Sequence, residues 1–333
     1  MYKINLCYNF HMSKIKVGVL RGGPSSEYEV SLKTGKSVID NLPEQYEALD
    51  IFISKDGTWH YSGTPMEPQH VFKKVDVIFN ALHGTYGEDG VVQKLMDQFS
   101  IPYTGSTALA SAVGMNKVLS KKVYNNFNIK TPIHTLIIKG CDISLESARV
   151  FKTFPMPAVV KPHCSGSSVG VSIVQTLPEL ENAIYKALDY SDTAIVEEFI
   201  AGREATCGVI DGFRNQEVYS LLPIEIGKSK ESTFYDYDAK YISDTQEIIC
   251  PGNFTAEEKK NIQEMAIKAH QALGLRHYSR SDFMIHPRRG VYILETNTLP
   301  GLTDHSLVPK SLVAIGSSLP EFLDHLITLA LKK

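Results

Sequence analysis

Three short apolar runs in the first hundred residues alternate with helix-forming segments, and this rhythm constrains the fold more than any other feature. The runs cover residues 15–20, 46–53 and 75–82, and Val30, Thr34 and Val38 recur at helical spacing after the first run. Strands that alternate with helices indicate a parallel sheet with helices on both faces. We therefore expect an α/β fold here, with a ligand at the carboxyl ends of the strands.

Two glycine-containing segments follow these strands, RGGPSSE at 21–27 and HGTYGEDG at 83–90. Ser26 and Glu29 have the spacing of a capping box, which predicts that a helix begins after Ser26. HGTYGEDG alone is typical of a tight turn. Its position at the carboxyl end of a strand places it on the ligand side of the sheet.

Composition narrows the classes of function. The 333 residues are enough for two or three domains. The formal charge of -3, with 34 basic and 37 acidic residues, argues against a dedicated nucleic-acid binder. Five widely spaced cysteines without a C-x-x-C pair fit a reducing compartment. An apolar run long enough to span a membrane is missing, and residues 1–12 are expected to be a disordered leader.

The segment KPHCSGSSVG, residues 161–170, lies between two apolar runs. A P-loop would place its lysine after the glycines and then begin a helix, whereas Lys161 precedes them and a strand follows. The dinucleotide pattern G-x-G-x-x-G is also missing. The segment is either a flap whose N–H and hydroxyl groups cover phosphates or a plain hairpin turn.

SRSDFMIHPRRGVYILETN, residues 279–297, reads as a β-hairpin. With a turn at 287–290 and residue 286 opposite 291, Asp282 faces Glu295 and Arg280 faces Asn297, and all four side chains share one face. Two carboxylates opposite each other require a positive partner. Arg280 is one candidate and a divalent cation is the other, since Asp, Glu and Asn oxygens suit Mg²⁺. We favour the metal site.

The opposite face of this hairpin is predicted to be apolar, which argues against a solvated surface hairpin. The residues assigned to that face are Phe283, Ile285, Tyr292 and Leu294.

Two further loops carry candidate groups. In TLPGLTDHSLVP, the backbone N–H of Gly301 could approach a reacting group, and Ser306 with Leu307 offers a hydroxyl and an amide for a carboxylate. An ordinary Pro/Gly loop explains this segment equally well when it is taken alone. Residues 228–246 are polar, tyrosine-rich and aperiodic, which is typical of a functional or mobile loop.

Nine motifs occur in one order along the chain, and together they resemble the D-alanine–D-alanine ligase family of the ATP-grasp superfamily. They are RGGPSSEYEVSL, HGTYGEDG, MNK, KPHCSGSSVG, EEFIAGRE, YDYDAKY, YSRSDF, LETNTLPG and HSLVP. The resemblance implies a three-domain architecture, α/β at the start and α+β later. Its parts would be an N-terminal substrate domain (13–106), a central subdomain with the phosphate flap (107–195) and a C-terminal subdomain with the metal site and the mobile loop (196–333).

The resemblance also implies roles for single residues. ATP would be bound by Lys117, Lys161, Ser168, Glu197, Glu198, Phe199, Ile200, Glu204 and Lys240. Two Mg²⁺ or Mn²⁺ ions would be held by Asp282, Glu295 and Asn297. The catalytic groups would be Glu27, Ser167, Tyr241, Arg280 and the Gly301 amide, and the further substrate contacts would be His83, Ser306 and Leu307.

The implied reaction joins two D-alanine molecules through a D-alanyl phosphate and releases ADP and phosphate, for peptidoglycan synthesis in the cytoplasm by a homodimer. Asn116 and Glu198 depart from the family, which commonly has Asp and in some members Lys there. Tyr241 in YDYDAKY favours the dipeptide over D-alanyl-D-lactate. A ligase for another amino or hydroxy acid is the alternative. A ligand sensor would be favoured if Asp282 or Glu295 were missing, and a dehydrogenase needs the absent glycine pattern.

Overall fold

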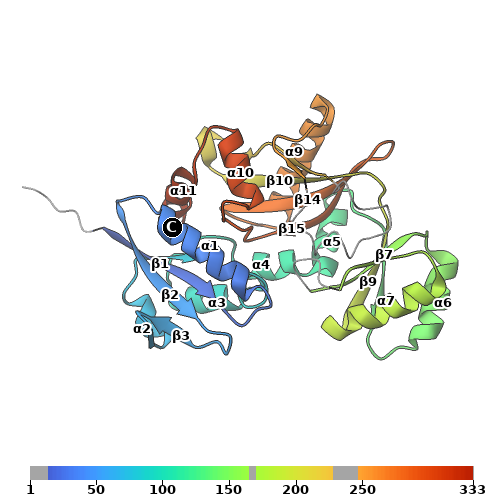
Figure 1. Ribbon diagram of the computed structural model, residues 1–333, viewed down its shortest axis with the longest axis horizontal. Helices are drawn as coiled ribbons and strands as arrows, with labels where there is room; N and C mark the ends of the chain where they lie inside the picture. The colour runs from blue at the N-terminus through green and yellow to red at the C-terminus, as the bar shows by residue number, and fades with distance from the viewer. Residues whose placement is uncertain (1–13, 165–169, 228–246, 333) are drawn as a thin grey trace, which may run out of the picture.

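The computed structural model describes residues 14–164, 170–227 and 247–332, and its strands form three sheets (Figure 1). In Figure 1 the first and second sheets lie on opposite sides of the molecule, and the third lies between them. The predicted leader 1–12 and loop 228–246 lie outside the described residues. So do four predicted site residues, Ser167, Ser168, Lys240 and Tyr241.

The first sheet has the strand order β4-β3-β2-β1-β5, and β1 is parallel to both β2 and β5. This confirms the parallel sheet expected from the sequence. β3 and β4 extend it in antiparallel pairing, which the sequence did not predict. The elements are β1 (Ile15–Gly22), β2 (Tyr46–Ile53), β3 (Trp59–Tyr61), β4 (Thr64–Pro65), β5 (Val77–Asn80), α1 (Tyr28–Asn41), α2 (Pro68–Phe72) and α3 (Val91–Gln98).

The two faces of β1 belong to different cores because successive side chains of a strand point to opposite sides. Val19 packs in one core with Phe322 of the last helix, α11 (Leu319–Leu331). Leu20 packs in the other core with Met96 of α3. The end of the chain therefore covers the sheet formed by its beginning, and Figure 1 shows α11 beside that sheet.

The second sheet has the order β6-β9-β7-β8, with every pair antiparallel. Two helices pack on it, and Val160, Ile184 and Val196 belong to their common core. The elements are β6 (His134–Ile138), β7 (Ala158–Pro162), β8 (Ser172–Val174), β9 (Thr193–Glu198), α6 (Ile143–Thr153) and α7 (Leu177–Tyr190). The strand–loop–strand arrangement expected around KPHCSGSSVG is present as β7 and β8.

The third sheet has the order β13-β12-β10-β14-β15, and β11 also pairs with β10. Its strands are β10 (Arg203–Asp211), β11 (Val218–Ser220), β12 (Ile224–Ile226), β13 (Ile248–Ile249), β14 (Tyr278–His286) and β15 (Gly290–Asn297). The other helices within the described residues are α4 (Ala108–Met115), α5 (Lys117–Asn126), the 3₁₀ turn η1 (Phe213–Asn215), α9 (Ala256–Ala272) and α10 (Leu307–Ala314).

Two helix starts differ from the sequence-based expectation. The sequence predicts one helical segment around residues 107–127, but the structure has two helices there. Asn116 leaves the helical conformation, and its Oδ1 accepts the N–H groups of Val118 (3.0 Å) and Leu119 (3.1 Å). Asn116 is thus the N-cap of α5. The predicted capping box at Ser26 is wrong, since the N-cap of α1 is Glu27 and it makes no side-chain capping bond.

The hairpin of β14 and β15 keeps the predicted pairing at the functional end but reaches it by another route. His286 pairs with Gly290, so the turn is one residue shorter than predicted. A register shift next to Asp282 compensates, and Asp282 faces Glu295 as expected. An extra residue in one strand is a β-bulge, and here the extra residue is Leu294.

The bulge changes which side chains share the apolar face. Phe283 lies opposite Ile293, and Ile285 lies opposite Val291. These four residues belong to one buried core. The assignment of Tyr292 and Leu294 to that face is therefore wrong, because it assumed one continuous register along the hairpin, without a bulge.

Within the described residues, no single helix is long and apolar enough to cross a membrane. The pair α10 and α11, bent by 106°, meets the criterion together by length and composition alone.

Candidate active site

Three loops that are distant in sequence meet at the carboxyl ends of the first sheet. A Cβ atom on Gly84 would lie 3.0 Å from Oε2 of Glu27, so HGTYGEDG contacts the loop after β1. The N–H of Leu299 donates to Oε1 of Glu88 (3.1 Å), which joins HGTYGEDG to the loop after β15. The expectation that both glycine-containing segments lie on one side of the sheet is confirmed.

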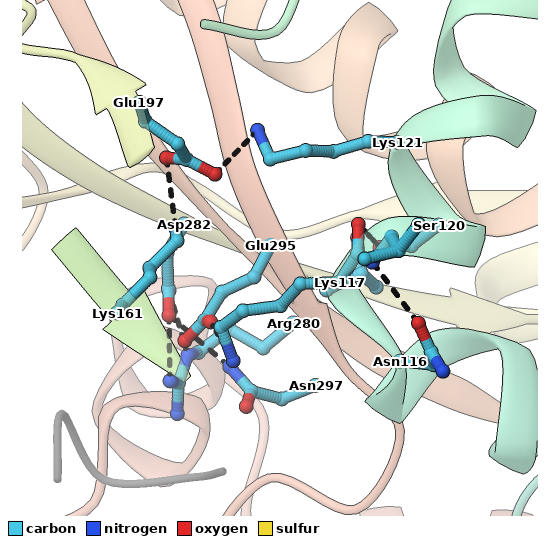
Figure 2. A network of polar contacts seen from close by, with 12 residues as sticks. Asn116, Lys117, Ser120, Lys121, Lys161, Glu197, Arg280, Asp282, Glu295 and Asn297 are labelled. Atoms are coloured by element: carbon cyan, nitrogen blue, oxygen red, sulfur yellow. Dashed lines mark hydrogen bonds and ion pairs between the residues drawn. The ribbon is translucent and has the colours of Figure 1, made fainter. Parts of the chain in front are cut away.

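The polar face of the hairpin is centred on Asp282 (Figure 2). Arg280 donates two hydrogen bonds to its two carboxylate oxygens, from Nε and Nη2, each 3.0 Å long. Nδ2 of Asn297 donates to Oδ2 (3.1 Å), and the hydroxyl of Thr206 donates to Oδ1 (2.6 Å). Arg280 also faces Asn297 across the strands, as predicted. Of the two candidate positive partners, Arg280 pairs with Asp282 in this structure.

Glu295 has a different cation. Nζ of Lys117, in the first turn of α5, lies 3.0 Å from its Oε2. Burial raises the pKa of Glu295, but the charges of Lys117 and Lys161 outweigh it and hold that pKa at about 2. Glu295 is therefore ionised at neutral pH, and the predicted lysine and the predicted metal ligand lie together.

The predicted metal ligands fit a divalent cation. No cluster of three or more His, Cys, Asp or Glu side chains that could hold a metal occurs among the residues that the structure describes. Asp282 and Glu295 instead face each other on adjacent strands with Asn297 beside them. Two carboxylates and an amide oxygen are hard ligands of the kind that Mg²⁺ and Mn²⁺ prefer. In this structure the ammonium group of Lys117 neutralises Glu295, and the guanidinium group of Arg280 neutralises Asp282.

Glu27 shares the electrostatic environment of the hairpin. Burial raises the pKa of Glu27, the charge of Glu295 raises it further, and Lys117 and Arg280 lower it. Its backbone N–H donates to Oγ of Ser25 (3.1 Å). The structure therefore brings the residue predicted to bind an amino group close to the predicted metal and oxyanion residues.

His83 is buried between two elements of the site. Its Nε2 lies 2.8 Å from Oγ1 of Thr34 in α1. Burial lowers the pKa of His83 to about 4. A hydrogen bond to the backbone of Leu299 raises this pKa, and the charge of Arg280 lowers it. His83 is thus neutral at pH 7 and ties α1 to the loop after β15; its role toward a substrate stays a prediction.

Glu88 is a site residue that the sequence interpretation missed. Its carboxylate accepts the N–H of Gly84 at Oε2 (2.7 Å) and the N–H of Leu299 at Oε1 (3.1 Å). Burial raises the pKa of Glu88 to about 8, and the charge of Glu27 contributes to the rise. The sequence suggested only that an acidic residue suits a helix start. Nothing local indicated that its carboxylate reaches a loop two hundred residues away.

Gly301, Ser306 and Leu307, the candidate groups of TLPGLTDHSLVP, lie close together. A Cβ on Gly301 would lie 2.9 Å from Oγ of Ser306, so only glycine fits without a shift. Ser306 is the N-cap of α10 and Leu307 is its first residue. The hydroxyl of Ser306 accepts the N–H of Thr303 (3.1 Å). The positive end of the α10 dipole at this point suits a carboxylate.

The segment predicted to bind adenine comprises the last two residues of β9 and the two residues that follow it. The N–H of Glu198 donates to the carbonyl of Ile133 (3.0 Å), and the N–H of Phe199 donates to that of Pro157 (3.3 Å). The Glu198 carboxylate forms an ion pair with Arg289. These three groups therefore already have protein partners. Ile200 is buried, and Glu204 lies on β10 opposite Met284.

Glu197 and Lys161 are also neighbours. Nζ of Lys161 lies 2.9 Å from Oε2 of Glu197, and Nζ of Lys121 lies 2.9 Å from Oε1 (Figure 2). Lys121 was not predicted as a site residue, because a lysine in a helix is usually solvated.

Family models cover most of the chain. The model described as D-ala D-ala ligase N-terminus matches residues 16–70 and 62–106, and the one described as D-ala D-ala ligase C-terminus matches residues 126–328. The chain belongs to the D-alanine–D-alanine ligase family. A curated family member from Desulfotalea psychrophila is 38% identical over 323 residues, 96% of each chain. Another from Geobacter sulfurreducens is 39% identical and covers 89% of this chain and 87% of its own.

Two solved ligase structures show the same architecture as this chain. The VanG D-Ala:D-Ser ligase from Enterococcus faecalis has a TM-score of 0.84 and 31% identity, covering 95% of this chain and 99% of its own. The D-alanine-D-alanine ligase from Coxiella burnetii has a TM-score of 0.81 and 28% identity, covering 96% and 94%. The mixed α/β fold expected from the family resemblance is confirmed.

Proposed function

We propose that this chain is an ATP-dependent D-alanine–D-alanine ligase that forms D-alanyl-D-alanine, a peptidoglycan precursor. One observation supports this most directly. The half-buried carboxylate of Glu27 lies within the electrostatic reach of Glu295, Lys117 and Arg280, although these groups come from separate parts of the chain. A site that binds an ammonium group next to groups for phosphate and metal suits activation of an amino acid's carboxylate.

In the first step, ATP transfers its γ-phosphoryl group to the carboxylate of the first D-alanine, which gives D-alanyl phosphate and ADP. Glu27 would bind the amino group, and Lys117 and Lys161 would bind the phosphates. Asp282, Glu295 and Asn297 would hold two Mg²⁺ or Mn²⁺ ions, which offset phosphate charge when bound. Catalysis in phosphoryl transfer is mainly positioning and electrostatic stabilisation, which fits this collection of charges.

In the second step, the neutral amine of the second D-alanine attacks the carbonyl carbon of D-alanyl phosphate. A C–N bond forms, the bond from carbon to the phosphate oxygen breaks, and inorganic phosphate leaves with the proton that the amine loses. Arg280 and the N–H of Gly301 would stabilise the oxyanion of the tetrahedral intermediate. Ser306 and Leu307, at the start of α10, would bind the carboxylate of the second D-alanine.

The remaining assignments rest on the family resemblance. Glu197, Glu198, Phe199 and Ile200 would contact adenine, Glu204 the ribose, and His83 the first D-alanine. The assignments for Ser167, Ser168, Lys240 and Tyr241 concern residues outside the described part. The domain boundaries at 106 and 195, a homodimer and a cytoplasmic location are proposed on the same ground.

The test is release of ADP and phosphate, with the dipeptide identified by mass. D-Alanine with ATP and Mg²⁺ should give ADP and D-alanyl-D-alanine in equal amounts, and L-alanine should give neither. D-Serine and D-lactate, each offered with D-alanine, test the second substrate; the similarity to a D-Ala:D-Ser ligase makes D-serine a necessary comparison. Turnover with D-lactate or D-serine but not with a second D-alanine would overturn the proposed product.

A further inference from the structure

Glu197 lies between two lysine side chains that reach it from different elements (Figure 2). Lys121 comes from α5 and Lys161 from β7, and each ammonium nitrogen lies 2.9 Å from one carboxylate oxygen. Only 2% of the surface of Glu197 is exposed. Two ammonium groups around one carboxylate leave a positive charge in excess. One of the lysines is therefore not needed to neutralise Glu197.

The surroundings of the two lysines show which one can leave. Lys121 is fully enclosed, with a side-chain exposure of 0%, and its Nζ also donates to Oγ1 of Thr131 (2.6 Å). Lys161 precedes Pro162 at the end of β7, where the chain enters the segment predicted to cover phosphates. Its side chain is 9% exposed. Lys161 can therefore exchange its partner, whereas Lys121 is held in place.

A buried carboxylate that loses its only cation is strongly destabilised, because little solvent replaces the lost interaction. If Lys161 were the sole partner of Glu197, its transfer to another anion would leave the Glu197 carboxylate buried and without a cation. With Lys121 present, Glu197 remains paired during the exchange. The helix supplies Lys121 one turn after Lys117, on the same face of α5.

We propose that Lys121 is the permanent counter-ion of Glu197, and that it thereby releases Lys161 to bind the phosphates of a nucleotide. This inference rests on the proposed function, which assigns Lys161 to ATP. Lys121 is a positioning residue, since it acts through Glu197 and Lys161 and does not contact the nucleotide. Its removal should weaken binding of a ligand with phosphates more than binding of the same ligand without them.

The experiment compares the dissociation constants of ATP and adenosine by calorimetry for the wild type and Lys121→Met. Lys122→Met is the matched control, because Lys122 is the next residue of α5 and is exposed. The Lys121 variant should bind ATP at least about tenfold more weakly, which equals about 1.4 kcal/mol, while adenosine affinity changes little. The Lys122 variant should bind both ligands as the wild type does.

A double variant keeps the test informative if the single variant does not fold. Lys121→Met with Glu197→Gln removes both charges, and a neutral glutamine needs no counter-ion when Lys161 leaves. The ratio of ATP affinity to adenosine affinity should therefore return toward the wild-type ratio. A double variant whose ratio stays low would overturn the proposal.

The pH dependence provides a second readout. Burial lowers the pKa of Lys121 to about 8, Glu197 raises it, and Lys161 and Lys117 lower it. His134 lies within electrostatic reach of Lys121, and burial and the charge of Lys121 lower the pKa of His134. Lys121 is charged below pH 8 and loses its charge above it. In the wild type the preference for ATP over adenosine should fall above about pH 8, and in Lys121→Met this fall should be absent.

Three further results would overturn the inference. The first is that Lys121→Met weakens the binding of ATP and of adenosine equally, which would indicate a merely structural role. The second is that Lys121→Met binds both ligands as the wild type does. The third is that the preference for ATP over adenosine has the same pH profile in Lys121→Met as in the wild type. Dipeptide formation by the wild type is measured in parallel. A wild-type chain that binds ATP but forms no dipeptide would refute the proposed product and leave the role of Lys121 to the binding data. A wild-type chain that binds no ATP would overturn both proposals.

Discussion

Replacing Gly84 by alanine tests whether the HGTYGEDG loop positions Glu27. Gly84 has a φ of +68°, and an added Cβ would lie 2.5 Å from Oγ of Ser25 and 3.0 Å from Oε2 of Glu27. The first distance is shorter than real contacts allow, so Ser25 must move. Glu27 follows Ser25 by two residues and its N–H donates to the Ser25 hydroxyl, so it should move as well.

The structure offers a control that separates backbone strain from this contact. Gly63 has a φ of +76°, and an added Cβ there would meet nothing within 4 Å. A left-handed backbone costs an L-residue roughly 1–2 kcal/mol, so Gly84→Ala and Gly63→Ala should both lose about that much free energy of unfolding. Only Gly84→Ala should also displace Glu27.

A displacement of about 1 Å in a positioning group can reduce the rate by about 10²-fold. We therefore expect kcat/KM for D-alanine to fall by roughly 10- to 100-fold in Gly84→Ala, about 1.4–2.7 kcal/mol of transition-state stabilisation. Initial rates of ADP formation and urea unfolding curves give the two quantities. Equal kcat/KM for Gly84→Ala and Gly63→Ala would refute the reasoning that this loop positions Glu27.

Further predictions concern other parts of the site. Glu295→Gln should reduce turnover by about 10²-fold or more, because it removes the charge of a proposed metal ligand, while Glu264→Gln at an exposed position of α9 should not; equal rates would contradict the metal assignment. Because the pKa of Glu295 is about 2, below its ordinary 4.5, the stability it contributes is present above pH 4.5 and is lost as the pH falls toward 2. Urea unfolding at pH 7 and pH 3 should show a smaller loss in Glu295→Gln than in the wild type. Tyr241→Phe should keep most dipeptide synthesis but raise the relative use of D-lactate, measured by competition between the two second substrates. Tyr124→Phe removes a buried hydrogen bond to Thr296 (2.8 Å) and should cost about 1 kcal/mol in unfolding experiments, with turnover unchanged.

The hairpin shows both how far the sequence predicts this site and where prediction stops. Period-two alternation places Asp282 and Glu295 on one face, and their direct pairing is correct because two deviations from the predicted register cancel each other. The turn is one residue shorter than predicted, and the extra residue Leu294 at the bulge restores the predicted register beyond it. A bulge has no strong sequence signal, so the polar face was predicted correctly while the apolar face was not.

The missed residues, Glu88 and Lys121, share a physical cause. Both are charged side chains at positions where a local pattern predicts exposure, a helix start and a helix surface. Their partners are distant in sequence: Leu299 for Glu88 and Glu197 for Lys121. Local periodicity indicates which face of a helix is apolar. It does not indicate that the side chain of a helical lysine forms an ion pair with a buried carboxylate on a strand that is distant in sequence.

The charges of the site form pairs that a nucleotide and its metal can exchange. Asp282 is paired with Arg280, and Glu295 is paired with Lys117. A ligand that brings phosphates together with a divalent cation offers each partner of the Lys117–Glu295 pair a group of opposite charge. Neither residue then remains buried and unpaired, so the exchange avoids the large desolvation cost of breaking an ion pair. Glu197 differs, because no cation of the ligand is expected at it, and this is why its second lysine matters for binding.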